Sequence, residues 1–328
     1  MWWARRVGAG GVLLDDLRRH AGHLCVPVGN PRSTAEARRR PVYGLAIEIL
    51  QVVTSTDRRG AEVFAVELGD ALSARGWDVR TVALAGGTGG SRLELPILGG
   101  NPFGVATLRA LRAEARRARV VIAHGSRTLP ACALALLATR VPFVYRNIGD
   151  PTYWSPRGLR HLRTKLFLSR ATAVVALTPE AATTLRDRYR VPDRKLTVIP
   201  TAASAARHPP ATTEVRQAAR SSLGIPADAP VAAVIGALSR EKGVDVAIDA
   251  AALLPKVHLV VAGDGPERAA LEAASTRDAA GRVHFIGALI DPSPAFDAAD
   301  IVLLPSRTEG LPAVLIEAGL RGLPAVAT

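Results

Sequence analysis

The feature that most limits the fold of this chain is a regular alternation of short apolar runs with helical patterns, from about residue 45 to Thr328. The apolar runs include IEILQVVT, VAAVIG, HLVVAG and IVLLP, whereas Gly60 to Arg75 carries apolar residues at helical spacing. Strands that alternate with helices form parallel sheets, because each connection crosses back through a right-handed helical unit. The sequence therefore predicts an α/β fold.

The length of 328 residues suggests about two domains. Residues 1–42 are rich in Arg, Gly and Pro and show no period, so we expect a tail outside the fold. We expect a first Rossmann-like domain over residues 43–205 and a second over residues 206–328. Residues 201–228, which include TAASAARHPPATTE, predict a linker between them.

The net charge limits the kinds of partner that the protein can bind, and the cysteine content indicates its compartment. The formal net charge of +13 suits nucleic acid, an anionic membrane or phosphorylated ligands. Aromatic residues make up only 4% and do not interleave with a basic stripe, which argues against nucleic acid. Cys25 and Cys132 have neither disulfide-framework nor metal-site spacing, so we expect free thiols in the reducing cytoplasm. No run reaches the roughly 18 apolar residues of a membrane span.

One predicted helix has two interpretations, and one of them is contact with a membrane surface. RGLRHLRTKLFLSR predicts a helix with Leu159, Leu162, Leu166 and Phe167 on one face and basic residues around it. We favour a solvated basic face over an ordinary core stripe. The alternative is a helix that lies on anionic lipid and gives the protein a peripheral place at the inner membrane face.

The last stretch, PSRTEGLPAVLIEAGLRGLPAVAT, predicts a binding site. It follows a buried strand and opens a helix at Gly310, Leu311 and Pro312, whose free N–H groups and dipole would suit a phosphate. Glu309 and Glu317 flank this helix start, and carboxylates accept hydrogen bonds from sugar hydroxyls. The segment predicts a clamp for a phosphorylated sugar or a nucleotide, although similar strand–turn–helix units occur in many α/β proteins.

Three motifs in this order resemble those of a known family. The run E-G-x-P-x-x-x-x-E-A-x-x-x-G-x-P, preceded by IGALSREKGVDVAIDAA and VVAGDGPERAALEA, is similar to the signature of retaining glycosyltransferases of family 4. The resemblance implies the GT-B architecture, in which two Rossmann-like domains face a cleft. It also implies transfer of a sugar, with retention of configuration, from a nucleoside diphosphate sugar to a glycan, a lipid-linked sugar or a small molecule. No metal or other cofactor is expected, since no Asp-x-Asp motif is present.

The resemblance also implies roles for individual residues. His124, at the end of the apolar run VVIAH, takes the place of the family's active-site histidine. Lys242 is similar to the phosphate-binding lysine, and Glu309 to the carboxylate that contacts the transferred sugar. The remaining donor contacts are expected from Gly60, Arg240, Gly263, Asp264, Gly265, Gly310, Leu311, Pro312 and the ribose-binding Glu317. Relatives continue beyond the position of Thr328, so we expect the second domain to be incomplete.

Departures from the family pattern keep other functions open. Arg59 and Gly60 stand where the family usually has two glycines, and Ala237 stands where an arginine is common. These changes favour, as an alternative, a catalytically degenerate protein that only binds nucleotide sugars. A sugar-nucleotide epimerase of the same architecture is less favoured, and a basic surface-binding module is a third alternative.

Overall fold

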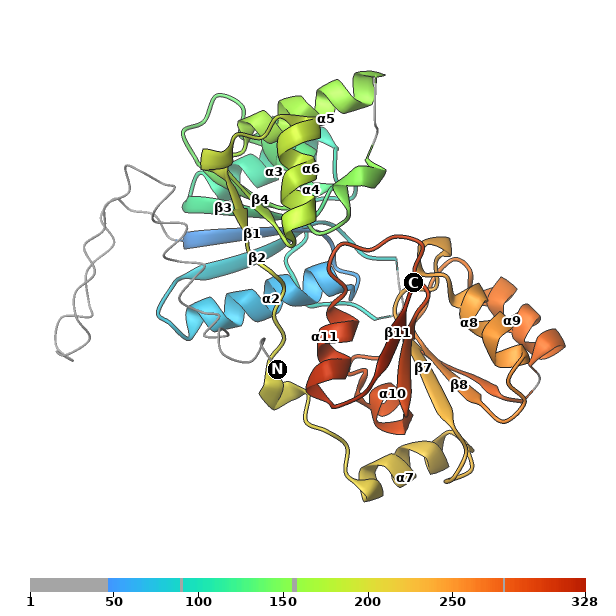
Figure 1. Ribbon diagram of the computed structural model, residues 1–328. Coiled ribbons are helices and arrows are strands. Elements are labelled where there is room, and N and C mark those ends of the chain that lie inside the picture. Colours follow the sequence, from blue (N-terminus) through green and yellow to red (C-terminus); the bar gives the residue numbers. More distant parts are fainter. Residues whose placement is uncertain (1–46, 89–90, 155–157, 280) are drawn as a thin grey trace. The chain divides into compact units, whose positions relative to one another are not determined.

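The computed structural model describes residues 47–88, 91–154, 158–279 and 281–328, and the predicted tail lies outside these residues. The chain divides into two compact α/β units (Figure 1). The first contains most of the chain up to Pro200, and the second contains Thr201–Thr328 together with two short segments, Asp57–Gly60 and Gly87–Leu93. Each unit contains one sheet, and all strand pairs in both sheets are parallel. The predicted α/β class with two Rossmann-like domains is confirmed.

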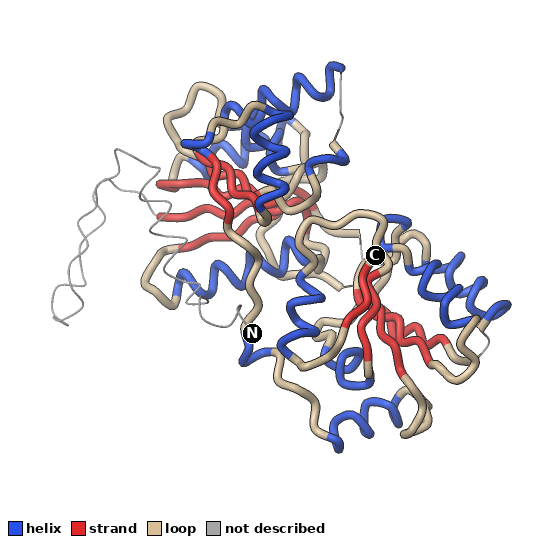
Figure 2. The backbone as a smooth tube through the Cα atoms, viewed as in Figure 1, coloured by secondary structure: helices blue, strands red, loops and turns tan. Residues whose placement is uncertain are grey.

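The first unit has a six-stranded sheet in the order β2-β1-β3-β4-β5-β6. Its strands are β1 (Ile47–Ser55), β2 (Val79–Ala85), β3 (Ala118–His124), β4 (Phe143–Arg146), β5 (Ala173–Ala176) and β6 (Leu196–Val198). Its helices are α2 (Gly60–Ser73), α3 (Val105–Ala115), α4 (Thr128–Ala135), α5 (Gly158–Arg170) and α6 (Pro179–Tyr189). The chain runs from β1 to β2 on one side and then crosses to β3 on the other, so the strand order reverses at β1 (labelled in Figure 1, strands red in Figure 2).

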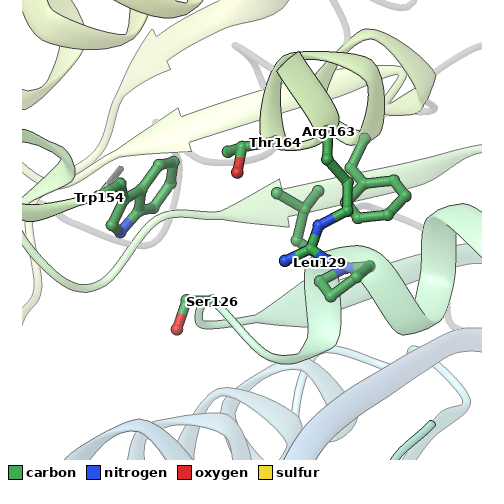
Figure 3. A pocket seen from close by; sticks show the side chains of 7 residues that line it. Ser126, Leu129, Trp154, Arg163 and Thr164 are labelled. Carbon is green, nitrogen blue, oxygen red and sulfur yellow. The ribbon is translucent and has the colours of Figure 1, made fainter. Parts of the chain in front are cut away.

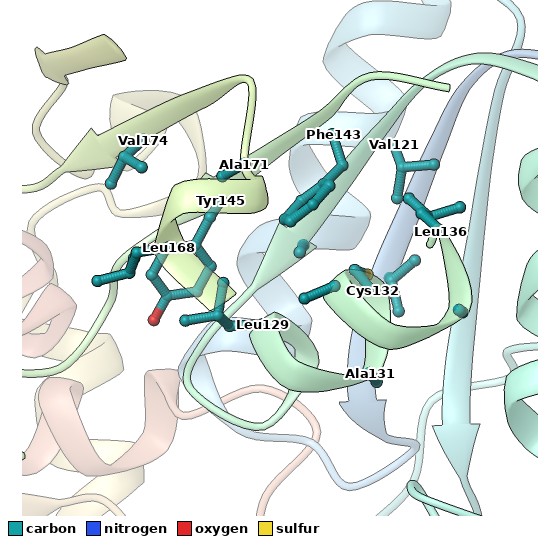
Figure 4. Packing of buried hydrophobic residues seen from close by; sticks show 14 of the residues in the cluster. Val121, Leu129, Ala131, Cys132, Leu136, Phe143, Tyr145, Leu168, Ala171 and Val174 are labelled. Atoms are coloured by element: carbon teal, nitrogen blue, oxygen red, sulfur yellow. The ribbon is translucent and has the colours of Figure 1, made fainter. Parts of the chain in front are cut away.

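The sheet of the first unit is covered on both faces. One face packs against α3, α4, α5 and α6 in a cluster that includes Leu50, Cys132 and Tyr145 (Figure 4). The other face packs against α2, with Ile49 and Val53 of β1 in two smaller clusters. Since successive side chains of a strand point to opposite faces, Gln51 lies on the α2 face.

The second unit has a five-stranded sheet in the order β11-β10-β7-β8-β9. Its strands are β7 (Val231–Ile235), β8 (His258–Ala262), β9 (Val283–Gly287), β10 (Ile301–Leu304) and β11 (Ala325–Ala327). Its helices are α7 (Thr213–Ser222), α8 (Val244–Ala252), α9 (Arg268–Asp278), α10 (Ser293–Ala298) and α11 (Ala313–Leu320). Buried clusters cover both faces of this sheet, one containing Ile248 of α8 and the other Ala295 of α10. The strand order reverses at β7, which lies between β10 and β8.

The prediction of a linker over residues 201–228 is wrong in part, because α7 lies inside it. The side chain of Thr212 caps this helix by accepting a hydrogen bond from Val215 N at 3.3 Å. Arg220 holds the helix to the unit through Nε to Ala298 O at 3.0 Å and an ion pair with Asp300 at 2.8 Å. Polar contacts rather than an apolar stripe hold α7, so hydrophobic periodicity could not reveal it.

The favoured interpretation of α5 is also wrong. Leu159, Leu162 and Leu166 were expected in the core, yet they are 85%, 62% and 60% exposed. The helix packs through Leu168, which is 1% exposed, and through Phe167 beside it. Over the residues that the structure describes, no helix is both long and apolar enough to span a membrane.

Candidate functional site

The second unit brings Lys242 and Glu309 together. Lys242 ends a short helical turn after β7, and Glu309 lies in the loop after β10. Lys242 Nζ lies 2.6 Å from Glu309 Oε1, and Ser306 Oγ donates a hydrogen bond of 2.7 Å to the same oxygen. The strand order of this sheet reverses at β7, which lies between β10 and β8. The pair lies in the loops that follow β7 and β10, which is the switch point where open α/β sheets bind their ligands.

Close packing between the two loops holds this pair in place. Gly243 has φ +63°, and a Cβ on it would lie 1.9 Å from Pro305 O, so no other residue fits without rearrangement. Arg307 N donates to Glu241 O at 2.8 Å, and the Arg307 guanidinium forms an ion pair with Asp245 at 2.6 Å. The hydrogen bond from Arg307 lowers the pKa of Asp245. The loops after β7 and β10 are thus tied together by both backbone and side-chain bonds.

The glycine turn after β8 has a packing reason of its own. Gly263 has φ +149°, and a Cβ on it would lie 1.8 Å from Gly236 O. A Cβ on Gly265 would also be too close to its neighbour, at 2.3 Å from Leu238 O. Leu238 N donates a hydrogen bond to Asp264 O at 3.0 Å. The sequence-based expectation was that these glycines contact the donor. The contact between the ends of β7 and β8 already requires them.

The start of α11 differs by one residue from the expectation. The helix begins at Ala313, and Pro312 is its N-cap rather than its first helical residue. The side chain of Pro312 cannot accept a hydrogen bond, so the N-cap residue does not cap the first N–H groups of this helix. Gly310 and Leu311 precede it, and Glu317 lies within it, partly buried. Arg240 is exposed, and its guanidinium makes no hydrogen bond or ion pair within the described part of the chain.

In the first unit, His124 ends β3 and is 1% exposed. Its Nε2 lies 3.0 Å from Gln51 Oε1, while Gln51 Nε2 donates to Ala65 O at 2.7 Å and Thr81 Oγ1 at 3.2 Å. Since both amide protons of Gln51 are used, its oxygen accepts, and the histidine proton lies on Nε2. The buried Nδ1 of His124 has no hydrogen-bond partner among the described residues.

Burial sets the charge state of this histidine. Burial, and then the charge of Arg146, lower the pKa of His124 to about 3. Arg146 ends β4 in register with His124, and its guanidinium lies 3.7 Å from the ring centre of Phe64 on α2. Burial also lowers the pKa of Arg146 to about 10, so it stays charged at neutral pH. The imidazole is thus neutral and offers Nδ1 as an acceptor.

A pocket lies close to the end of β3 (Figure 3). It has a volume of about 190 Å³ and lies where Ser126 and Pro130 near the start of α4 face α5. Its wall combines the Trp154 ring and Phe167 with the Arg163 guanidinium and the hydroxyl groups of Ser126 and Thr164. Aromatic, cationic and hydroxyl groups together can bind a small polar molecule with one apolar face.

Sequence reasoning missed several of these residues. Gln51, Phe64 and Arg146 surround His124, and Ser306 shares the Glu309 oxygen with Lys242. Arg146 follows the run FVY directly, which was a usable signal, because ligands bind at the ends of such strands. Gly60 begins α2, and a Cβ on it would meet no atom within 4 Å, so packing gives no reason for a glycine there.

Two family models together match most of the chain. Residues 58–207 match the model described as Glycosyltransferase Family 4, and residues 215–328 match the model described as Glycosyl transferases group 1. Each of the two units is therefore matched by a glycosyltransferase family model of its own. The sequence-based resemblance is confirmed at this level.

Solved structures agree with the GT-B fold. HepE from Anabaena, in complex with UDP and glucose, aligns with a TM-score of 0.73 at 22% identity, over 86% of this chain and 80% of HepE. WaaG, a glycosyltransferase of lipopolysaccharide biosynthesis, aligns with a TM-score of 0.64 at 18% identity, over 85% and 80% of the two chains. At these identities the likeness concerns the fold alone.

Curated relatives match this chain over a shorter stretch. The lipopolysaccharide core biosynthesis glycosyltransferase LpsE of Rhizobium meliloti is 39% identical over 110 residues, which are 33% of this chain and 32% of LpsE. The D-inositol 3-phosphate glycosyltransferase of Mycobacterium leprae is 37% identical over 121 residues, 34% of this chain and 28% of that protein. The matched region thus spans about a third of these relatives or less.

Proposed function

We propose that this protein transfers a sugar from a nucleoside diphosphate sugar to an acceptor hydroxyl with retention of anomeric configuration. The observation that carries the proposal is the Lys242–Glu309 pair at the switch point of the second sheet, inside the matched glycosyltransferase domain. A fixed cation beside a fixed carboxylate suits a substrate with a diphosphate next to a sugar.

Each partner of the pair has a distinct role in this reaction. The bond between the anomeric carbon and the diphosphate breaks, a bond to the acceptor oxygen forms, and the acceptor proton is released. Lys242 stabilises the charge that grows on the leaving diphosphate, assisted by the uncapped N–H groups of α11. Glu309 accepts hydrogen bonds from hydroxyls of the transferred sugar, for which its Oε2 is not engaged by any described residue. Glu317 binds the ribose hydroxyls of the donor.

The first unit supplies the acceptor side of the proposed reaction. His124 is neutral, so it cannot act as a cationic acid near pH 7, and its Nδ1 accepts a hydrogen bond from a sugar hydroxyl only if a local movement uncovers this buried atom. The pocket at Trp154 and Arg163 suits an acceptor with an apolar ring face and an anionic group, since the ring stacks and the guanidinium pairs. Glycans, lipid-linked sugars and small phosphorylated molecules all offer this chemistry.

Nucleotide binding is the first test of this function. Addition of individual nucleoside diphosphates and their sugars should raise the melting temperature for one base, because a ligand of the folded state stabilises it. If no nucleotide or nucleotide sugar changes the melting temperature, the proposed function is wrong.

Turnover separates the leading function from the alternative. A donor labelled in its sugar should release free nucleoside diphosphate and label an acceptor from a panel of glycans and lipid-linked sugars. The alternative is a protein that binds nucleotide sugars without transfer, which Ala237 favours because it cannot contact a diphosphate as an arginine would. A clear melting shift without turnover would favour this alternative. The two glycosyltransferase matches make an epimerase or a basic surface-binding module less favoured.

The compartment stays a prediction. Cys132 is a buried free thiol, and burial raises its pKa to about 12, so it is an unreactive core residue. Cys25 lies outside the described residues. We propose the cytoplasm as the place of the reaction on the basis of the low cysteine content.

A further inference from the structure

Helix α5 presents three leucines to solvent, which we call the leucine ridge: Leu159, Leu162 and Leu166. They are 85%, 62% and 60% exposed, and their spacing of three and four residues puts them on one side of the helix. The opposite side holds α5 to the first unit, through Leu168 in the core and through His161, whose ring centre lies 4.9 Å from that of Tyr189. The ridge therefore points away from the core.

Positive charge surrounds the leucine ridge. The described helix carries Arg160, Arg163, Lys165 and Arg170 and contains no acidic residue. None of these four forms an ion pair with a described residue. Lys195 lies at the end of α5, where its Nζ donates to Ser169 O at 2.9 Å and Ala171 O at 2.7 Å. Burial, and then the charges of Arg194 and Arg170, lower the pKa of Lys195.

We propose that the leucine ridge and its basic border dock the protein on the surface of an anionic lipid bilayer. A helix with an apolar side and a basic border lies in the plane of a membrane interface, with the leucines among the upper acyl chains and the cations at the lipid phosphates. The proposal goes beyond the transferase function, since binding needs neither donor nor acceptor. It adds to the chain a surface that would bring it to acceptors held in a membrane.

Charge and size favour lipid over a protein partner. A second copy docked through the same ridge would bring two basic borders together, and like charges at an interface oppose association. A stable protein interface engages about 20–30 residues on each side, many more than one helix face supplies. A lipid surface needs neither shape complementarity nor a large patch.

The test is binding of the full chain to vesicles of phosphatidylcholine alone or mixed with phosphatidylglycerol, followed by flotation. The unmodified protein should bind the mixed vesicles and release from them as salt rises to about 1 M, where the Debye length falls to about 3 Å. The triple variant Leu159→Ser/Leu162→Ser/Leu166→Ser should bind at least about tenfold more weakly, since three apolar anchors are lost. The pair Arg160→Gln/Arg170→Gln should lose the preference for anionic lipid.

Matched controls separate the ridge from general stickiness. Leu253→Ser changes a leucine that is 82% exposed in the second unit, and Arg116→Gln/Arg117→Gln removes two exposed charges from another part of the first unit. Both controls should bind as the unmodified protein does. The proposal is overturned if the triple variant binds mixed vesicles normally, if the controls lose as much binding as the ridge variants, or if the ridge variants only abolish a dimer. A large fall in the melting temperature of the triple variant would also overturn it, because exposed leucines contribute little to folding.

Discussion

Lys242 Nζ and Glu309 Oε1 lie 2.6 Å apart although 67 residues separate them in the chain. The two loops that carry them are joined by the contact of Gly243 with Pro305 and by the Arg307–Asp245 ion pair. The pair is partly exposed, with 28% of the Lys242 side chain and 20% of the Glu309 side chain accessible. A ligand can therefore reach both groups, and their separation is set before it binds.

Replacement of Lys242 by alanine should lower the catalytic rate by about 10²–10³-fold, which is typical for loss of one group that stabilises transition-state charge. Steady-state kinetics with the donor found in the nucleotide screen would measure this. Lys256→Ala is the matched control, because Lys256 is an exposed lysine of the same unit and should leave the rate unchanged. An unchanged rate for Lys242→Ala would remove Lys242 from the mechanism.

Glu309→Ala should lower both the catalytic rate and the discrimination between donor sugars, because the carboxylate contacts the transferred sugar. Kinetics with two donors that share a base but differ in the sugar would show both effects. Glu241→Gln removes one negative charge next to Lys242 from an exposed side chain and should change neither quantity. Equal losses for all donors, with discrimination intact, would indicate that Glu309 only orients Lys242.

Glu317→Ala should act mainly on the Michaelis constant for the donor. Ribose hydroxyls are bound similarly before and during transfer, and such uniform binding affects affinity rather than rate. Steady-state kinetics at saturating acceptor would measure kcat and the KM for the donor, and the KM should change more than kcat. A variant that loses turnover while its donor affinity stays the same would contradict the ribose role and the placement of the phosphate at the start of α11.

The elements of both sheets were largely predictable because their boundaries carry local signals. Helix α6 begins at Pro179, after Thr178, whose side chain accepts a hydrogen bond from Ala181 N at 3.1 Å, and both residues are readable as start signals. Strand β4, Phe143–Arg146, begins directly after Pro142 and ends before Asn147, and both residues are readable as boundary signals. Local sequence was sufficient for these two elements.

The orientation of an apolar face was not predictable in the same way. Periodicity placed Leu159, Leu162 and Leu166 on one side of a helix, but it cannot tell whether that side meets the core.

The hydrogen-bond partners of His124 could not be predicted from the sequence for a related reason. Gln51 lies 73 residues away, and only the pairing of β1 with β3 brings the two side chains together. The roles assigned to His124, Lys242 and Glu309 stay predictions until variants are measured.

His124 should remain neutral, with its proton on Nε2, well below the usual pKa of histidine. Its pKa in the folded state is about 3, whereas in the unfolded chain it is near 6.5. Between these values the unfolded chain binds more protons, so this group should lower the free energy of unfolding as pH falls, by up to about 1.4 kcal/mol per pH unit. Imidazole nitrogen NMR would report the tautomer, and the difference in pH dependence between the unmodified protein and His124→Gln would report the stability effect. A chemical shift that titrates near pH 6.5 would contradict the buried, neutral state.

Gly263→Ala should destabilise the second unit by about 2–4 kcal/mol, in the range of backbone strain combined with overpacking. The added Cβ would meet Gly236 O at 1.8 Å, and φ +149° is a conformation that alanine rarely adopts. Gly319→Ala is the control, because Gly319 lies inside α11 with no atom within 4 Å of an added Cβ, and alanine there should raise stability slightly. Urea denaturation measures both changes, and nucleotide binding at low temperature measures what remains of the site. If Gly263→Ala folds as stably as the unmodified protein but loses nucleotide binding, the glycine is required by the ligand rather than by the packing of β7 on β8.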